Sequence, residues 1–200
     1  MKDTSRKYEV VLVGCSAGGM EALSQLLRGI KPEIDAAVAI VQHLGPSMDN
    51  YLVSHLRGQT PLPLHEATDK IPMEYGHVYV APPNYHLLVE KDRTFSLSLE
   101  GRVNFARPSI DVLFESAARA FGEAVIAVIL TGANRDGSEG CREVKERGGV
   151  VLVQDPETAE HRTMPDAAVR SIPHLVAALN DLAVEINRLT TKPTAGPRTH

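Results

Sequence analysis

The sequence contains little cysteine, little net charge and no long apolar run, and each of these absences excludes a class of protein. Only two cysteines occur, Cys15 and Cys141, so no disulfide framework is predicted and a reducing, cytoplasmic setting fits. The net charge of −4 does not favour nucleic acid or an anionic membrane as a partner. No apolar segment is long enough to insert into a membrane, and the polar start, residues 1–7, is not a signal peptide.

Metal-ligand spacing and internal repeats are also missing. The 8 histidines and 2 cysteines are scattered, so the sequence predicts no metal site and no cofactor. With 43% hydrophobic residues, the 200-residue chain can bury the core of one α/β domain. We expect that domain to cover residues 1–189, with residues 190–200 as a flexible tail or linker rich in Thr, Lys, Pro and Gly.

Short apolar runs alternate with helical patterns along most of the chain. Strands buried on both faces are predicted at residues 10–13, 36–41, 124–130 and 150–153, with a shorter strand at 62–66. Helices are predicted at residues 20–30, after a cap at Ser47 through Leu56, at 110–118 after a cap at Ser109, at 140–147, from Met164 and over 172–189. This alternation predicts a doubly wound, mostly parallel α/β sheet.

The middle of the chain has a different pattern. Residues 76–83 and 86–90 are typical of strands, and residues 95–99 alternate apolar and polar side chains after a turn at 91–93. Two strands joined by so short a turn form a hairpin. We therefore expect part of the sheet to be antiparallel.

The turn after the first strand has the spacing of a nucleophile elbow. It reads Gly14-Cys15-Ser16-Ala17-Gly18, and glycines on both sides of a serine allow a sharp strand-to-helix turn that exposes the hydroxyl. Two other interpretations remain open at this point: Ser16 could bind a phosphate, or it could simply cap the helix.

Three strands end at the same predicted edge with residues that can do chemistry. Ser16 follows the first strand, His43 the second, and Asp136 the strand at 124–130. Ligands of doubly wound sheets bind at the carboxyl ends of the strands. A nucleophile, a base and an orienting carboxylate can meet there as a Ser-His-Asp triad.

Each of these residues also has a structural interpretation. His43 could make only a structural hydrogen bond, and Asp136 could serve an Asp-Gly turn. Asp155, at another strand end, is the rival orienter. Cys15 is an alternative nucleophile, although it precedes the apex of the elbow and should point into the packing.

Several segments, in this order, resemble the catalytic domain of the CheB family of chemotaxis protein-glutamate methylesterases over residues 10–189. The segments are Gly14–Gly19, Gln42-His43, Val78–Pro82, Arg107–Phe114, Leu130–Gly140 and Met164-Pro165. The resemblance implies that Ser16, His43 and Asp136 are nucleophile, base and orienter. It also implies a substrate, the glutamate methyl esters on cytoplasmic helices of methyl-accepting chemoreceptors, and for some members deamidation of glutamine there.

The sequence departs from the family pattern at two places. Ala17 stands where the family usually has Thr or Ser, and Ala133 and Asn134 replace Met and Gly in Thr-Gly-Met-Gly-x-Asp-Gly. We expect Asn134 to preserve the turn by adopting unusual backbone angles, and the lost Met to open the pocket wall or shift an oxyanion contact. No receiver domain precedes Val10, so a stand-alone esterase or a part of a larger protein with a receiver or methyltransferase domain is expected.

The predicted reaction is acyl transfer from a side-chain ester to Ser16. Backbone N–H groups near Ala17 and in the loop Thr131-Gly132-Ala133-Asn134 are expected to stabilise the oxyanion. Arg107, Arg135 and Met164 are further candidates for contact with the substrate, and Arg135 and Arg162 could attract an acidic receptor surface.

Two other functions stay open. One is a catalytically weak or inactive receptor-binding module of the same fold. The other is a nucleotide-binding Rossmann domain, which is disfavoured because Ser16 stands where close approach of a phosphate needs glycine.

Overall fold

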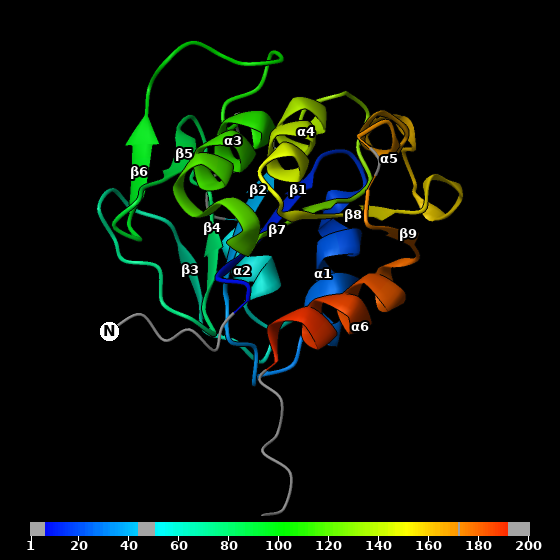
Figure 1. Ribbon diagram of the computed structural model, residues 1–200, viewed down its shortest axis with the longest axis horizontal. Coiled ribbons are helices and arrows are strands. Elements are labelled where there is room, and N and C mark those ends of the chain that lie inside the picture. The colour runs from blue at the N-terminus through cyan, green and yellow to red at the C-terminus, as the bar shows by residue number, and fades with distance from the viewer. Residues whose placement is uncertain (1–6, 44–50, 172, 192–200) are drawn as a thin grey trace, which may run out of the picture.

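The computed structural model describes residues 7–43, 51–171 and 173–191 of the chain. Seven strands in these ranges form one sheet in the order β3-β4-β2-β1-β7-β8-β9, and every neighbouring pair is parallel (Figure 1). The strands are β1 Val10–Cys15, β2 Ala37–Gln42, β3 Leu64–Glu66, β4 Val78–Val80, β7 Val125–Ile129, β8 Val150–Gln154 and β9 Leu175–Ala177. The central strand β1 is where the chain changes direction across the sheet, and ligands of such sheets bind beside that point.

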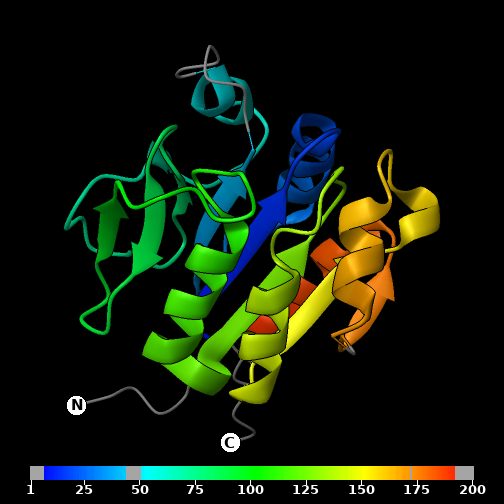
Figure 2. The same cartoon turned by 90° about the horizontal axis from the view of Figure 1, so that it is seen from above.

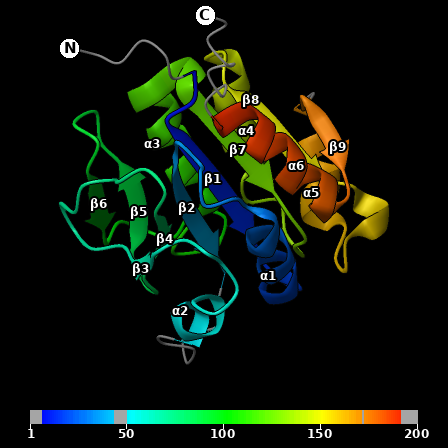
Figure 3. The same cartoon turned by 90° about the horizontal axis from the view of Figure 1, so that it is seen from below.

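Helices cover both faces of the sheet, which confirms the doubly wound prediction (Figures 2 and 3). The helices are α1 Gly19–Gly29, α2 Tyr51–Leu56, α3 Ile110–Phe121, α4 Ser138–Glu146, α5 Thr163–Val169 and α6 Leu179–Thr190, with 3-10 turns η1 Gly122–Ala124 and η2 Pro156–Thr158. Within these ranges, no helix is long and apolar enough to cross a bilayer.

The side chains of β1 alternate between two hydrophobic cores, one on each face of the sheet. Val11 and Val13 pack with α1 and α6 on one face, whereas Val10 and Leu12 pack with α3 and α4 on the other. Successive side chains of a strand point to opposite faces, so a strand that is apolar throughout must be covered on both sides. The elements at the carboxyl end of β1 are therefore held from two directions.

The predicted hairpin exists, but it is separate from the main sheet. It consists of β5 His86–Val89 and β6 Phe95–Ser98, which pair only with each other in an antiparallel sheet of two strands. The expectation that part of the main sheet is antiparallel was therefore wrong. Leu87 and Phe95 are fully buried in the core beside α3, so the hairpin covers the core with one face and adds no strand to the sheet.

The predicted helix over residues 172–189 is also corrected. Residues 175–177 form β9 on the edge of β8, and α6 begins only at Leu179. The free edge of β8 offers hydrogen-bonding groups that a short apolar segment can satisfy as a strand. The predicted cap at Ser47 lies outside the described residues, as does the tail beyond residue 191.

Candidate active site

The carboxyl ends of β1, β2 and β7 bring Ser16, His43 and Asp136 to one edge of the sheet. The Ser16 N–H donates to Thr131 O at 3.0 Å and the His43 N–H donates to Cys15 O at 3.0 Å, so the three strand ends are joined. Ser16, His43 and Asn134 line one cavity of about 320 Å³. Asp136 is completely buried behind it.

Glycines make the turn around Ser16 possible. Gly18 has φ +76°, a left-handed conformation that favours glycine, and it is the N-cap residue of α1, two residues after the serine. A Cβ on Gly14 would overlap the side chain of Ile110 at the start of α3. The elbow therefore needs glycine once for its backbone angle and once for close packing.

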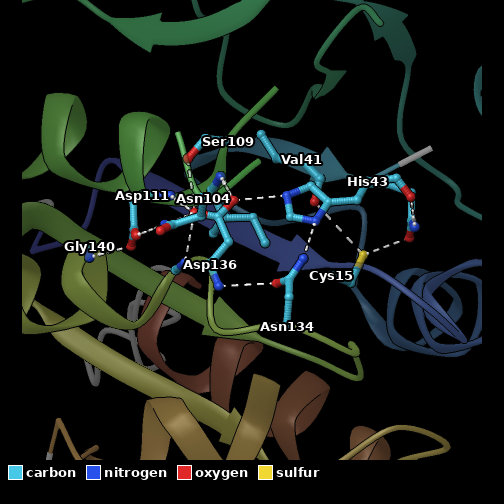
Figure 4. A network of polar contacts seen from close by, with 12 residues as sticks. Cys15, Val41, His43, Asn104, Ser109, Asp111, Asn134, Asp136 and Gly140 are labelled. Carbon is cyan, nitrogen blue, oxygen red and sulfur yellow. Dashed lines mark hydrogen bonds and ion pairs between the residues drawn. The ribbon is translucent and has the colours of Figure 1, made fainter. Parts of the chain in front are cut away.

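Asp136 holds His43 through a short ionic hydrogen bond (Figure 4). Asp136 Oδ2 lies 2.8 Å from His43 Nε2. The carboxylate also accepts hydrogen bonds from the backbone and side chains around the start of α3. These donors are the N–H groups of Ile110, Asp111 and Gly137, the Ser109 hydroxyl and the Asn104 amide.

These contacts decide the charge of Asp136. Burial alone raises the pKa of this carboxyl, but the hydrogen bonds from His43, Asn104 and Ile110 outweigh burial and lower the pKa to about 2. The group is therefore an anion at neutral pH. The rival Asp155 is turned elsewhere, because its side chain accepts from Glu157 N at 3.0 Å and caps η2.

Asn134 occupies the other nitrogen of the His43 ring. Its Nδ2 lies 3.1 Å from His43 Nδ1, and its Oδ1 accepts the Asp136 N–H at 3.0 Å. Its φ is not positive, so the expected unusual backbone angle was wrong, and the side chain supports the turn instead. No hydrogen bond joins the side chains of Ser16 and His43 in the part of the chain that the structure describes.

Gln42, the last residue of β2, connects the segments that carry Ser16 and His43. Its Nε2 donates to Ser16 O at 2.7 Å and to His43 O at 2.8 Å. Its Oε1 accepts from Cys15 Sγ at 2.9 Å. Cys15 is fully buried, and burial raises the pKa of its thiol far above the usual value, which disfavours the alternative of Cys15 as nucleophile.

The loop after β7 is held by its own hydrogen bonds. Thr131 N–H donates to Gln154 Oε1, and Gly132 N–H donates to His161 O at 3.0 Å. Thr131 Oγ1 also donates to Ala17 O at 3.0 Å, which links this loop to the elbow. The N–H groups of Thr131 and Gly132 are thus already engaged, so the position of these two residues favours a role in holding the elbow.

Comparisons with known proteins agree with this geometry. The family model for CheB methylesterase matches residues 11–186. The chain belongs to the CheB methylesterase family. A putative protein-glutamate methylesterase/protein-glutamine glutaminase from Leptospira interrogans is 47% identical over 164 residues, which are 82% of this chain and 85% of the relative.

Two further members of the CheB methylesterase family extend the comparison. The protein-glutamate methylesterase/protein-glutamine glutaminase of Trichodesmium erythraeum is 36% identical over 91% of this chain, which spans 53% of that relative. The crystal structure of the Thermotoga maritima CheB methylesterase catalytic domain superposes with a TM-score of 0.88 at 29% identity, over 92% of this chain and 99% of that one. Regulation by a receiver or methyltransferase domain stays a prediction.

The other residues proposed to contact substrate in this CheB family member are placed differently. Arg107 lines the cavity, but its guanidinium donates to Leu99 O at 2.8 Å and Glu100 O at 3.0 Å. Arg135 lines a neighbouring cavity of about 400 Å³ with Arg142 and Arg170. Met164 is buried against Gly132 and Ala133 is exposed on the loop.

The charge of Arg162 is offset by two acidic partners. It pairs with Glu157 at 2.9 Å and with Asp166 at 2.8 Å. A guanidinium with two carboxylates beside it contributes little net field, so Arg162 is a weak candidate for attracting an acidic receptor.

Sequence reasoning missed the segment 99–106, of which Arg102, Asn104, Phe105 and Ala106 line the cavity. Asn104 and Phe105 both have positive φ, 50° and 64°, and Phe105 is 95% exposed although it lines the cavity. Asn104 Nδ2 donates to Asp111 Oδ2 at 2.7 Å and to Asp136 Oδ1 at 3.0 Å. The unusual feature that marks this segment is the left-handed backbone conformation of the bulky Phe105. That conformation cannot be derived from the sequence.

Asp111 is a second buried acid behind Asp136. Burial raises its pKa to about 7, and the charge of Asp136 adds to this, while hydrogen bonds from Gly140 N–H and Asn104 oppose it. The two carboxyls therefore divide their roles: Asp136 is ionised, and Asp111 keeps its proton until near neutral pH. Among the described residues, no group of three or more His, Cys, Asp or Glu side chains could hold a metal ion.

Asp111 should make the protein less stable as the pH rises from about 4 to about 7. Between its unfolded and folded pKa values, the folded state binds the proton more tightly, so stability falls with rising pH. We expect Asp111→Asn to remove a fall on the order of 1–3 kcal/mol in the free energy of unfolding, measured by denaturant titration across this range.

The exposed Asp92 provides the control for this prediction. Asp92→Asn should keep the pH dependence of the parent. A slope in Asp111→Asn equal to that of the parent would show that Asp111 does not carry the proton.

Proposed function

We propose that the chain is a serine hydrolase that removes methyl esters from glutamate side chains of chemoreceptors and deamidates glutamine at such sites. The observation that carries the proposal is the ionised Asp136 that holds His43, by a contact of 2.8 Å, at the edge of the cavity that Ser16 also lines. The names of the relatives, protein-glutamate methylesterase/protein-glutamine glutaminase, support the choice of the bond that is cleaved.

In the proposed reaction, His43 Nδ1 takes the proton of the Ser16 hydroxyl while Ser16 Oγ attacks the ester carbonyl. The proton on His43 then passes to the leaving methoxide, so methanol departs and an acyl-serine remains. Water attacks this ester with His43 again as base, which releases glutamate and restores Ser16. With glutamine, ammonia leaves in place of methanol.

The developing oxyanion needs a donor that the fold leaves free. The Ala17 N–H has no hydrogen-bond acceptor within the described ranges, and it follows the nucleophile directly, at the start of α1. The Ala17 side chain supplies no hydroxyl of the kind that the family usually carries there. The backbone N–H is thus the donor we assign to this position.

A receptor-binding module without turnover is the second candidate, and Asn134 is the observation that favours it. Its amide occupies His43 Nδ1, the nitrogen that the mechanism needs. Incubation with an activated small ester separates the two candidates. A mass increase of one acyl group on Ser16, found by intact-mass and peptide analysis, supports the hydrolase, whereas no acylation with retained receptor binding supports the module.

Phe105 should contribute to receptor recognition, because an aromatic ring that is 95% exposed at the cavity gains by burial against a protein substrate. We expect Phe105→Ala to lower kcat/KM for a methylated receptor about tenfold and to leave a small methyl ester unaffected. Both rates are measured by methanol release.

Val184 on α6 offers a matched control, because it is 65% exposed on a helix that packs over the opposite face of the sheet. Val184→Ala should leave both rates unchanged. An equal fall on the two substrates in Phe105→Ala would mean that Phe105 supports the cavity itself, and recognition of the receptor would have to lie elsewhere.

A further inference from the structure

The amide of Asn134 has a defined orientation beside the base (Figure 4). Its Oδ1 accepts the N–H of Asp136 at 3.0 Å, and only an oxygen can accept there. The amide nitrogen must therefore face the ring, and its distance of 3.1 Å from His43 Nδ1 is that of a donated hydrogen bond.

The same network assigns the proton on His43. An ionised carboxylate only accepts hydrogen bonds, so the ring nitrogen that faces Asp136, Nε2, carries the hydrogen. Nδ1 then has the one free lone pair of the ring. The hydrogen-bond assignment thus places the basic nitrogen against Asn134.

From this arrangement we propose that Asn134 is a positioning residue that restrains the base: its amide holds His43 Nδ1 in the resting enzyme and competes with the Ser16 hydroxyl for that nitrogen. The inference rests on the proposed function, in which His43 accepts the proton of Ser16. Ser16, His43 and Asn134 line the same cavity, and in the proposed reaction the Ser16 hydroxyl needs the lone pair of Nδ1 that the Asn134 amide contacts.

Protonation of His43 Nδ1 makes the contact with the Asn134 amide repulsive, and this increases the barrier to proton transfer. Once Nδ1 carries the proton from Ser16, an N–H of the ring faces an N–H of the amide, and two donors repel each other. Rotation of the Asn134 amide would relieve this repulsion, but Oδ1 would then leave the Asp136 N–H without its acceptor. The amide must withdraw before the proton moves, and this step adds to the barrier.

Two substitutions separate this role from support of the turn. Asn134→Ser keeps an oxygen that can accept the Asp136 N–H but has no amide to reach His43. Asn134→Asp keeps the same shape and the same acceptor but places an anion against Nδ1. The charged groups around the ring, Asp136 with Asp111 behind it and Arg102 and Arg107 along the cavity, are the same in all variants.

We expect Asn134→Ser to raise kcat/KM on a small methyl ester about three- to tenfold, the usual worth of one hydrogen bond. The acid limb of its pH–rate profile should move to higher pH, because the ring protonates more readily without the amide. Asn134→Asp should lose activity at neutral pH by more than about tenfold and regain it in alkaline solution, since the added anion favours the protonated ring. The thermal midpoint of Asn134→Ser should fall by no more than about 4 °C, the shift that the loss of one hydrogen bond gives in a chain of this length.

Two results would overturn the proposal. A slower Asn134→Ser enzyme with an unmoved acid limb would show that Asn134 only supports the turn. A profile identical to that of the parent in rate and pH dependence would show that the amide does not hold the base.

A measurement without turnover keeps this test apart from the proposed function. ¹⁵N NMR of the His43 ring should find the proton on Nε2 in the parent, and protonation at higher pH in Asn134→Ser and at still higher pH in Asn134→Asp. If NMR gives this order but no protein, the parent included, hydrolyses the ester, the proposed hydrolase is wrong and the contact of Asn134 with His43 stands. If ester is hydrolysed but the order is absent, the restraint is wrong and the hydrolase stands.

Discussion

Replacing Ser16 by alanine should abolish methyl ester hydrolysis, with kcat lower by a factor on the order of a million. Without the hydroxyl there is no atom to form the acyl intermediate, and His43 has no proton to accept. The fold should survive, because the Ser16 side chain makes no hydrogen bond within the described ranges and stands at an elbow made by glycines. Methanol release from a methylated receptor measures the loss, and the melting temperature checks the fold.

Ser138 provides the matched control for this substitution. It begins α4 and lines the neighbouring cavity, away from the site that Ser16 lines. Ser138→Ala should hydrolyse the receptor ester at the rate of the parent. If Ser16→Ala kept the activity of the parent, another group would have to be the nucleophile, and the proposed hydrolase mechanism would be wrong.

Replacing Asp136 by asparagine should lower kcat by a factor on the order of 10⁴. The amide has the size of the carboxylate, but it cannot fix the Nε2 proton of His43 or stabilise the charged ring. The steady-state rate and the acylation burst should fall together, because both steps need the same base.

Asp155→Asn is the control that decides between the two candidate orienters. The Asp155 side chain caps η2 by accepting a hydrogen bond from the Glu157 N–H, so its substitution should leave kcat near that of the parent. A larger loss in Asp155→Asn than in Asp136→Asn would reverse the assignment.

Asp136→Asn should also reduce stability, and this effect is separable by pH. The lowered pKa of about 2 means that the Asp136 anion stabilises the fold above its unfolded pKa, and that this contribution is lost as the pH falls toward 2. The variant should be less stable than the parent at neutral pH and should lack that acid-dependent loss. Rates should therefore be compared well below the melting midpoint of the variant.

The parts of the site that the sequence predicted all follow from local patterns. Apolar runs that end in glycine or in polar residues predicted strands β1, β2, β7 and β8, and the ends of three of them were occupied by Ser16, His43 and Asp136. Parallel strands end at one edge, so these residues had to be close together. The contact of 2.8 Å between His43 and Asp136 lies where that reasoning placed it.

Patterns failed where a segment could satisfy its hydrogen bonds in more than one way. Residues 175–177 are as compatible with a helix as with a strand, and pairing with β8 decided for β9. The hairpin β5-β6 was recognised, but only packing against α3 determined that it stays apart from the main sheet. Ser109 is the N-cap residue of α3, as expected, but its hydroxyl makes no capping hydrogen bond to the helix and donates to Asp136 Oδ1 at 2.9 Å instead.

The sequence by itself determined strands β1, β2, β7 and β8, the elbow at Ser16 and the edge at which the polar strand ends meet, because periodicity and turn chemistry act over a few residues. Only the tertiary structure decided which of the two buried carboxyls near His43 is ionised, and which amide contacts the His43 ring. The distinct proton affinities of Asp111 and Asp136 arise from burial and from partners that are distant in the sequence, such as Asn104, 32 residues from Asp136, and His43, 93 residues from it. The contact of Asn134 with His43 spans 91 residues, and no local pattern of a sequence carries such a distance.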